Sequence, residues 1–258
     1  MAIANWASAR LGIDQKGSKV FRRQRFRIFL DLIDEALSRR DVCRILDIGG
    51  EVEYWTMVSD LIGDRNIYVT LVNLTAPAVD SSRFSSLAGD ARDLSSLADM
   101  SFDLVHSNSV IEHVGRWRDM LAMAQEVRRL APAYYVQTPY FWFPIEPHCS
   151  TAFFHWLPEP VRLSMLLRRP RGHWGMAPDV SSAMGQIQSA DLLDVRTMSA
   201  LFPDATIQRE KVAGLTKSLI AIRHAADMHA SGPGVDALAM PSRGQGEAAN
   251  RSVALASA

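Results

Sequence analysis

From Cys43 onward, short apolar runs alternate with amphipathic segments, and this alternation is the feature that most limits how the chain can fold. Runs with the length of a buried strand occur at 43–48, 66–74, 102–106 and 133–137. Segments with helical periodicity follow the first and the third of them, at 54–62 and 114–130. Strands joined through helices pair in parallel, so we expect an α/β fold with a doubly wound, mostly parallel sheet.

Two further apolar runs near the C-terminus, 205–213 and 218–223, are separated by only four residues. Parallel strands need a long crossover connection, whereas a connection this short joins antiparallel neighbours. We therefore expect the sheet to end in an antiparallel C-terminal hairpin.

The rest of the chain divides into one main domain and two irregular ends. Residues 1–17 predict a flexible N-terminus, and 18–40 an N-terminal helix with apolar residues at helical spacing. The last segment, 226–258, is rich in Ala and Gly without an apolar period and predicts a disordered tail. The main domain is expected to span 18–225, with an insertion at 138–190.

Composition excludes several classes of protein. Lys and Arg together number 28, as do Asp and Glu, so bulk positive charge does not favour a nucleic-acid-coating protein, and no nucleic acid is expected. No apolar run is long enough for a membrane-spanning helix, and a signal peptide is not expected. The two cysteines, Cys43 and Cys149, fit a cytoplasmic, reducing environment.

Two segments, 19–27 and 162–171, are rich in arginine, so an anionic binding partner remains possible. Each reads as the solvated face of a helix. The alternatives are a surface that guides an anionic substrate and a peripheral contact with an anionic membrane. The sequence does not predict the oligomeric state.

The strongest candidate site begins where the first strand ends, at Asp47 and the pair Gly49-Gly50. Glycine lets the backbone approach a ligand closely at the carboxyl edge of a parallel sheet, and an acid there accepts hydrogen bonds from a bound polar group. Two glycines alone are weak evidence, because many strand-to-helix turns use them only to make the turn.

Three further strings follow in order: GDARDL at 89–94, FDLVHSNSVIEHV at 102–114 and KSLIAI at 217–222. Together with the glycine turn, they resemble the class I S-adenosylmethionine-dependent methyltransferases, in particular the type 11 group. The resemblance covers roughly 42–224. It implies a Rossmann-like sheet of seven strands and S-adenosyl-L-methionine as the cofactor.

The resemblance also implies cofactor-binding residues at the carboxyl ends of four strands: Asp47, Gly49, Gly50, Asn73, Asp90, Ala91, Ser107 and Asn108. The glycine turn would hold the methionine end with Asp47 beneath it, and Asp90-Ala91 would meet the adenine. Asn73 stands where an acid normally accepts bonds from both ribose hydroxyls, and its amide can accept one. Ser107 and Asn108 would line the methyl-transfer site.

The glycine turn departs from the family pattern, because Glu51 and Glu53 occupy the positions of its second and third glycines. These carboxylates either reach the amino group or sulfonium of the cofactor, or crowd the site. In the second case the chain would be a non-catalytic scaffold or binding protein with the methyltransferase fold. A nicotinamide-dependent or nucleotide-sugar enzyme on a related sheet is a further rival.

Glu112-His113 raises the question of a metal. In some relatives an EVIEH sequence at this place supplies carboxylate and imidazole ligands, but here Ser109 replaces the first acid. The remaining pair has too few ligands unless His148 or His155 joins it. We expect no metal, and expect this segment to cap the following helix.

The segment 138–158 holds seven of the 21 aromatic residues of the chain, interleaved with prolines. It follows a strand, so it should lie at the carboxyl edge of the sheet. It predicts a lid that excludes water from a small-molecule or lipid-like acceptor; the alternative is a second small core. His148 is the preferred base, followed by His155 and Glu146, if the methyl goes to oxygen; an amine or carbon acceptor could need no base.

Overall fold

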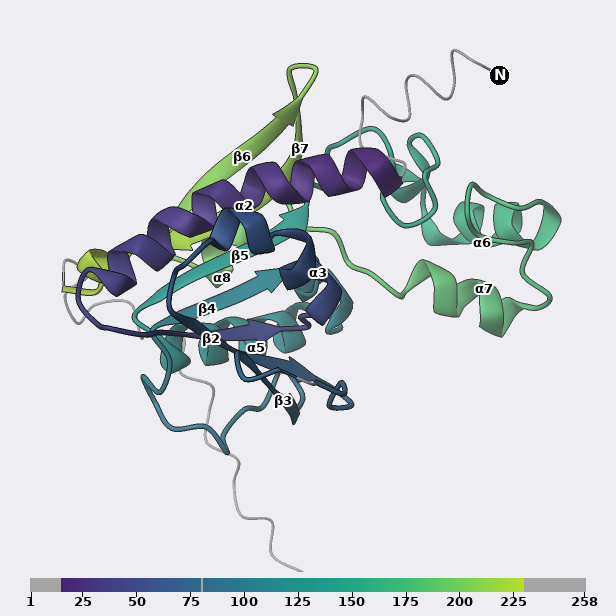
Figure 1. The fold of residues 1–258 in the computed structure, drawn as a ribbon. Helices are drawn as coiled ribbons and strands as arrows, with labels where there is room; N and C mark the ends of the chain where they lie inside the picture. Colours follow the sequence, from purple (N-terminus) through teal and green to yellow (C-terminus); the bar gives the residue numbers. More distant parts are fainter. Residues whose placement is uncertain (1–14, 80, 230–258) are drawn as a thin grey trace, which may run out of the picture.

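The core of the protein is a seven-stranded sheet in the order β3-β2-β1-β4-β5-β7-β6 (Figure 1). The computed structural model describes residues 15–79 and 81–229. The strands are β1 Cys43–Ile48, β2 Ile67–Asn73, β3 Phe84–Ala88, β4 Leu104–Asn108, β5 Ala133–Pro139, β6 Thr206–Val212 and β7 Leu215–Arg223. Strands β1 to β5 pair in parallel, and β7 is antiparallel to both β5 and β6. The predicted Rossmann-like, doubly wound sheet with an antiparallel hairpin is confirmed.

Three details differ from the sequence-based expectation. Strand β3 was not predicted from the sequence, because its residues FSSLA show no alternation of apolar and polar side chains. They are mostly half-buried and pair only with β2. Strand β4 begins two residues later than expected. The hairpin between β6 and β7 turns through only Ala213 and Gly214, which have φ values of 50° and 83°. Two consecutive positive φ values suit a tight two-residue turn, and its twist matches that of the strands.

Helices cover both faces of the sheet, as alternating side chains along the strands require. On one face α2 (Gln15–Leu37) packs Phe26 and Phe29 against Ile45 of β1, together with α3 (Val52–Met57) and α4 (Ser59–Ile62). On the other face α5 (Trp117–Leu130) and α8 (Val195–Leu201) pack against Leu46 and the neighbouring strands. Each face of the sheet therefore has its own apolar core.

The ends of the main domain differ slightly from prediction. Helix α2 begins at Gln15, inside the segment expected to be flexible, and ends at Leu37. After β7 a short 3-10 helix, η3, covers Ala225–His229. The rest of the predicted flexible N-terminus and disordered tail lies outside the described residues. Within the described residues, no helix has both the length and the apolar character needed to cross a membrane.

The arginine-rich start of α2 is partly neutralised by acids elsewhere in the fold. Arg23 pairs with Asp60 of α4 at 2.6 Å, and Arg25 pairs with Glu210 of β6 at 3.3 Å. These ion pairs tie α2 to α4, on the same face of the sheet, and to the edge strand β6. They account for part of the cluster without an external partner.

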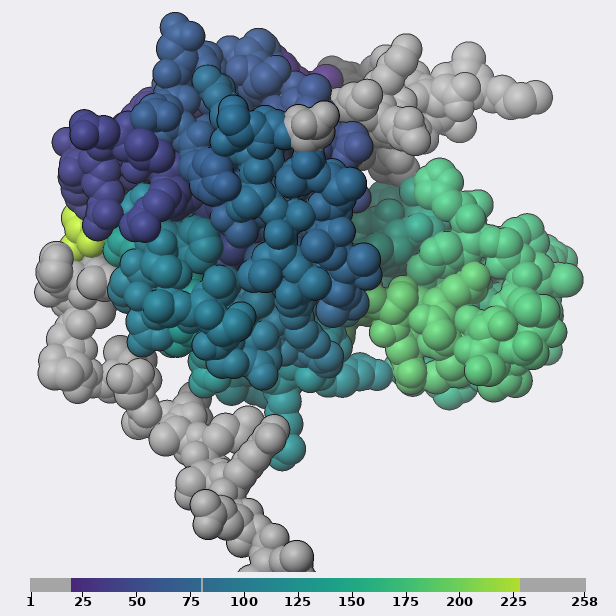
Figure 2. Space-filling view, turned by 60° about the horizontal axis from the view of Figure 1, so that its bottom comes forward, coloured from purple at the N-terminus to yellow at the C-terminus, as the bar shows by residue number. Residues whose placement is uncertain are grey.

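The segment between β5 and α8 forms a separate lobe beyond the carboxyl ends of β4 and β5 (Figures 1 and 2). It contains a 3-10 helix, η2 (Phe154–Trp156), and two helices, α6 (Glu159–Arg168) and α7 (Val180–Ile187). Its own small core consists of Cys149, Phe154, Leu166, Ala177, Ala183 and Ile187. Two aromatic residues of the lobe, Trp142 and Phe153, are more than half exposed. The aromatic segment therefore supplies both a core and an exposed surface.

Candidate functional site

The turn after β1 needs glycine at two consecutive positions for reasons of space. Gly49 has a φ of 73°, and a Cβ there would collide with Val110. A Cβ on Gly50 would collide with the carboxylate of Asp47, which lies directly beneath the turn. Packing within the protein therefore explains this glycine pair, whatever it binds.

Asp47 is 1% exposed and uses both carboxylate oxygens within the protein. Trp55 Nε1 donates to Oδ2 at 2.7 Å, and His106 Nδ1 lies 2.7 Å from Oδ1. The His106 ring lies between the rings of Tyr54 and Tyr135, with centroid distances of 5.3 and 5.5 Å. No prediction from the sequence indicated this buried network. The signal was a titratable His106 inside an apolar strand run, because a buried polar group needs a partner.

A cavity of about 750 Å³ opens at the carboxyl ends of β1 and β2. It is lined by Gly50, Glu51, Val52, Glu53, Thr56, Asn73, Thr75, Pro77, Ala78, Val79, Ser81 and Phe84. Asn73 Nδ2 donates to the Gly50 carbonyl at 2.8 Å, which leaves the side-chain oxygen as an acceptor. The volume suits a nucleoside-sized ligand, and the two exposed glutamates suit a positively charged one.

Only two of the predicted cofactor-binding residues, Gly50 and Asn73, line this cavity. Asp90, which follows β3, pairs with Arg92 at 2.6 Å, and their hydrogen bond lowers the pKa of that carboxyl. Ala91 is half-buried beside it. Ser107 is buried and its hydroxyl donates to the Ile48 carbonyl at 3.2 Å; Asn108 ends β4 and is half-buried.

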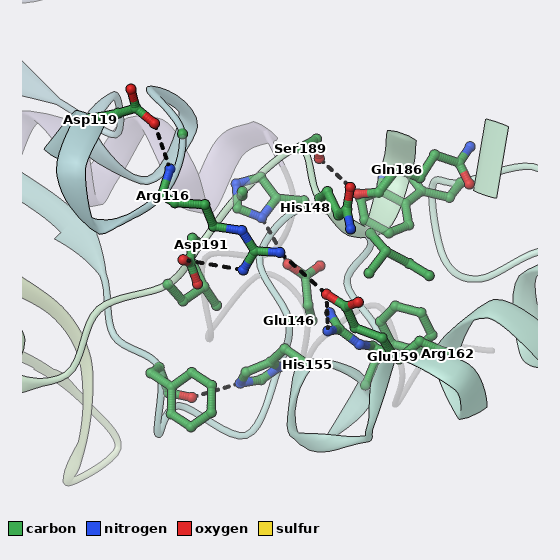
Figure 3. Close-up of a pocket in the computed structure, with 18 residues that line it drawn as sticks. Arg116, Asp119, Glu146, His148, His155, Glu159, Arg162, Gln186, Ser189 and Asp191 are labelled. Atoms are coloured by element: carbon green, nitrogen blue, oxygen red, sulfur yellow. Dashed lines mark hydrogen bonds and ion pairs between the residues drawn. The ribbon is translucent and has the colours of Figure 1, made fainter. Parts of the chain in front are cut away.

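A second cavity, of about 330 Å³, lies between the loop before α5 and the inserted lobe (Figure 3). Aromatic side chains of Phe141, Phe154 and Trp174 form part of its lining. Arg116 bridges the two sides, reaching Glu159 at 3.5 Å and Asp191 at 3.6 Å. The cavity therefore combines apolar walls with fixed charges, as small-molecule sites usually do.

Glu146 and His148, two of the predicted acid–base residues, point toward each other in this cavity (Figure 3). His148 Nδ1 lies 2.8 Å from Glu146 Oε1, and the backbone N–H of Cys149 donates to Glu146 Oε2 at 2.5 Å. Burial disfavours charge on both groups and is the largest single effect, but the hydrogen bonds and the attraction between opposite charges together outweigh it. The pKa of Glu146 is therefore lowered and that of His148 is raised.

His155, the other candidate base, lines the same cavity but directs its ring nitrogens into the protein. Nε2 lies 2.7 Å from the Phe141 carbonyl, so this nitrogen carries the hydrogen, and Trp156 Nε1 donates to the same oxygen at 2.8 Å. Nδ1 is buried without a hydrogen-bond partner, and burial lowers the pKa of the ring. This arrangement supports a neutral His155 that orients the loop.

The structure also brings Glu112 and His113 next to His148. His113 Nε2 lies 3.2 Å from His148 Nε2 and 4.0 Å from Glu112 Oε1. Glu112 is buried, which raises the pKa of its carboxyl. Glu112, His113, Glu146 and His148 are called the histidine cluster below. From the sequence, His148 and His155 are both able to join Glu112 and His113, but no local pattern indicates that His148 does.

The middle of the chain matches a known family. Residues 46–132 match the family model described as a methyltransferase domain. The strand order, with β7 antiparallel between β5 and β6, is the arrangement that the resemblance to class I methyltransferases implied. The resemblance to the class I methyltransferases is confirmed, and so is the cofactor that it implies, S-adenosyl-L-methionine.

Several solved structures are similar to the chain at low sequence identity. A chain of the complex between the Haloferax volcanii Trm112 methyltransferase activator and a methyltransferase candidate is 15% identical, covering 75% of this chain and 88% of its own, with a TM-score of 0.43. The PH0226 protein of Pyrococcus horikoshii OT3 is 16% identical, with 82% of this chain and 92% of its own chain covered and a TM-score of 0.44. PigF, solved with SAH, is 13% identical, with 70% of this chain and 56% of its own chain covered and a TM-score of 0.42. No curated protein matches the chain.

Proposed function

From the premise that this chain carries an S-adenosylmethionine-dependent methyltransferase domain, we propose that it methylates a hydroxyl oxygen of a small acceptor in the 330 Å³ cavity. One observation carries this proposal. The Glu146–His148 pair belongs to a cavity with aromatic walls, beyond the strand ends where the cofactor is expected. A carboxylate that orients an imidazole favours removal of a hydroxyl proton, which an amine acceptor would not need.

In this proposal the methyl donor lies in the 750 Å³ cavity beside the β1 turn. The side-chain oxygen of Asn73 accepts a hydrogen bond from one ribose hydroxyl. In this proposal Glu51 and Glu53, which line the cavity, offer negative charge to the amino group and the sulfonium of the cofactor. Asp90, expected to face the adenine, and Asn108, expected to face the methyl-transfer position, lie outside the lining of this cavity.

The cofactor supplies an activated methyl group when it is bound. The histidine cluster promotes loss of the acceptor hydroxyl proton, and Arg116 and the aromatic walls hold the acceptor in line with the methyl carbon. The acceptor oxygen forms a bond to the methyl carbon as the carbon–sulfur bond breaks. That electron pair stays on sulfur and the hydroxyl proton passes to the histidine cluster, so the products are a methyl ether and S-adenosylhomocysteine.

Titration calorimetry should show one-site binding of S-adenosylhomocysteine and S-adenosylmethionine to the full chain, and none of NAD at the same concentration. Both sulfur ligands carry an ammonium group that the two glutamates attract, and S-adenosylmethionine adds a sulfonium charge, whereas NAD brings an anionic pyrophosphate. A rise in melting temperature with either sulfur ligand provides a second readout. Absence of binding of both at millimolar concentration would favour the non-catalytic binding protein instead.

Replacing His148 with alanine should slow methyl transfer by about 10²–10⁴-fold, the usual contribution of a positioned acid–base group. The assay measures transfer of labelled methyl from S-adenosylmethionine to a panel of small alcohols, phenols, carboxylic acids and amines. His173→Ala is the matched control, because His173 is an exposed imidazole of the same lobe, outside the cavity. Equal rates for the two variants, or labelling of amines only, would contradict proton removal from oxygen by this cluster.

A further inference from the structure

We infer that Glu112, His113 and His148 form a binding site for one divalent transition-metal ion. Each of these three residues offers one ligand atom, and the three atoms all lie within 4.8 Å of one another. Two histidines and one carboxylate are a common ligand set for zinc and for iron(II), and they leave coordination positions open for other ligands. Hard cations such as magnesium prefer sites made of oxygen atoms, so this nitrogen-rich set does not favour them.

The distance between the two imidazoles agrees with shared coordination. Their Nε2 atoms are 3.2 Å apart. With zinc–nitrogen bonds of about 2.0–2.1 Å in a tetrahedral site, two ligand nitrogens lie roughly 3.3 Å from each other. Glu112 Oε1 lies 4.0 Å from His113 Nε2, within reach of the same ion after a small side-chain adjustment.

Both imidazoles are oriented by their other nitrogen, as metal ligands usually are. His113 Nδ1 donates to the Ser189 carbonyl at 2.7 Å, and His148 Nδ1 donates to Glu146 Oε1 at 2.8 Å. A carbonyl and a carboxylate can only accept, so the hydrogen of each neutral ring lies on Nδ1. With both rings neutral, the two Nε2 lone pairs face each other at 3.2 Å, and either a proton or a metal cation between them removes the repulsion. A bound cation converts this repulsion into attraction.

The carboxylate provides independent support. Glu112 has a fully buried side chain, and its Oε2 accepts a hydrogen bond from Thr138 Oγ1 at 3.0 Å. Its Oε1, which lies toward the two histidines, is buried without a hydrogen-bond partner. A buried carboxylate oxygen without a partner is costly, and coordination of a cation satisfies it.

The site has an entrance, because His113 is 40% exposed in its side chain and His148 lines the 330 Å³ cavity. An ion held here keeps open positions toward that cavity. Its role in the reaction rests on the proposed function: coordination of the acceptor hydroxyl lowers the pKa of that group and fixes its oxygen. In that case His148 acts as a ligand, and the substrate class narrows to molecules with an oxygen that can bind a metal.

The test uses the metal alone, so its result does not depend on methyl transfer. The full chain is stripped with a chelator and titrated with Zn²⁺ by calorimetry, and with Co²⁺ by visible absorption, which reports coordination by nitrogen and oxygen. We expect one equivalent of each metal to bind. His113→Ala and His148→Ala should each weaken Zn²⁺ affinity by at least about 100-fold, since even residues that only orient a ligand contribute about 10–100-fold.

His173→Ala is the control and should bind Zn²⁺ as the unchanged chain does, because this exposed histidine lies outside the cluster. Both altered ligands, His113 and His148, are at least partly exposed, so these variants should fold, which circular dichroism checks. Absence of Zn²⁺ binding to the unchanged chain would overturn the inference. Equal Zn²⁺ affinity of His148→Ala and His173→Ala would also overturn it. In that case a shared proton, and not a metal ion, would lie between the His113 and His148 rings.

Discussion

Replacing Asp47 with alanine should lower the free energy of unfolding by about 3–5 kcal/mol, as measured by urea denaturation. The carboxylate is buried and accepts hydrogen bonds from Trp55 Nε1 and His106 Nδ1, both at 2.7 Å. Alanine leaves two buried donors without an acceptor, in a core that water does not reach. It also leaves a space beneath Gly50, whose missing Cβ makes room for this carboxylate.

Two variants separate the hydrogen bonds from other effects of removing Asp47. Asp31→Ala is the matched control: Asp31 is an exposed residue within α2, and its loss should change the unfolding free energy by no more than about 0.5 kcal/mol. Asp47→Asn should cost less than Asp47→Ala, about 1–2 kcal/mol. The amide oxygen can accept from Trp55, and its NH₂ can donate to His106 if the ring adopts its other tautomer.

The outcome that contradicts this prediction is equal stability of Asp47→Ala and Asp31→Ala. In that case the buried network beneath the turn would contribute nothing to folding. The glycine pair would then need another explanation, and direct contact of Asp47 with a ligand would become the better one.

Replacing Gly172 with alanine should disrupt the inserted lobe around the histidine cluster. Gly172 has a φ of 54°, where a Cβ alone costs about 1–2 kcal/mol, and this Cβ would collide with the backbone carbonyl of Cys149. A backbone atom cannot rotate away as a side chain can, so the Cys149 segment must move. Since Cys149 N–H donates to Glu146 Oε2, the orientation of His148 moves with it.

Hydrogen exchange of the lobe measures this effect. We expect the backbone amides of 146–187 to exchange at least about 100-fold faster in Gly172→Ala, while those of β1, β4 and β5 keep their protection. Gly175→Ala is the matched control, because a Cβ there meets no atom within 4 Å. If the two variants exchange alike, the loop adapts to the added methyl group and Gly172 does not hold the cluster in place.

Most of the sheet follows from local sequence. Strands such as β1 and β5 are almost completely buried, and their continuous apolar runs indicated them directly. Strand β3 escaped prediction because it lies at the sheet edge, is only half-buried and contains two serines. Its pairing with β2, rather than its composition, makes it a strand.

The candidate sites divide in the same way. The sequence located the glycine turn, Asp47 and the aromatic segment, because each has a local pattern with a known physical cause. It did not indicate that His106 lies against Asp47, 59 residues earlier in the chain. Nor did it indicate that Arg92, not a ligand, is the present partner of Asp90.

By itself, the sequence determined the α/β class, the antiparallel hairpin and the methyltransferase resemblance, since these depend on periodicity, loop length and ordered strings. Only the tertiary structure decided which titratable groups meet. His113 follows β4 and His148 belongs to the lobe after β5, 35 residues later, so their contact depends on how that lobe packs against the sheet. Packing of the lobe is a sum of many weak long-range contacts, and no short stretch of sequence contains it.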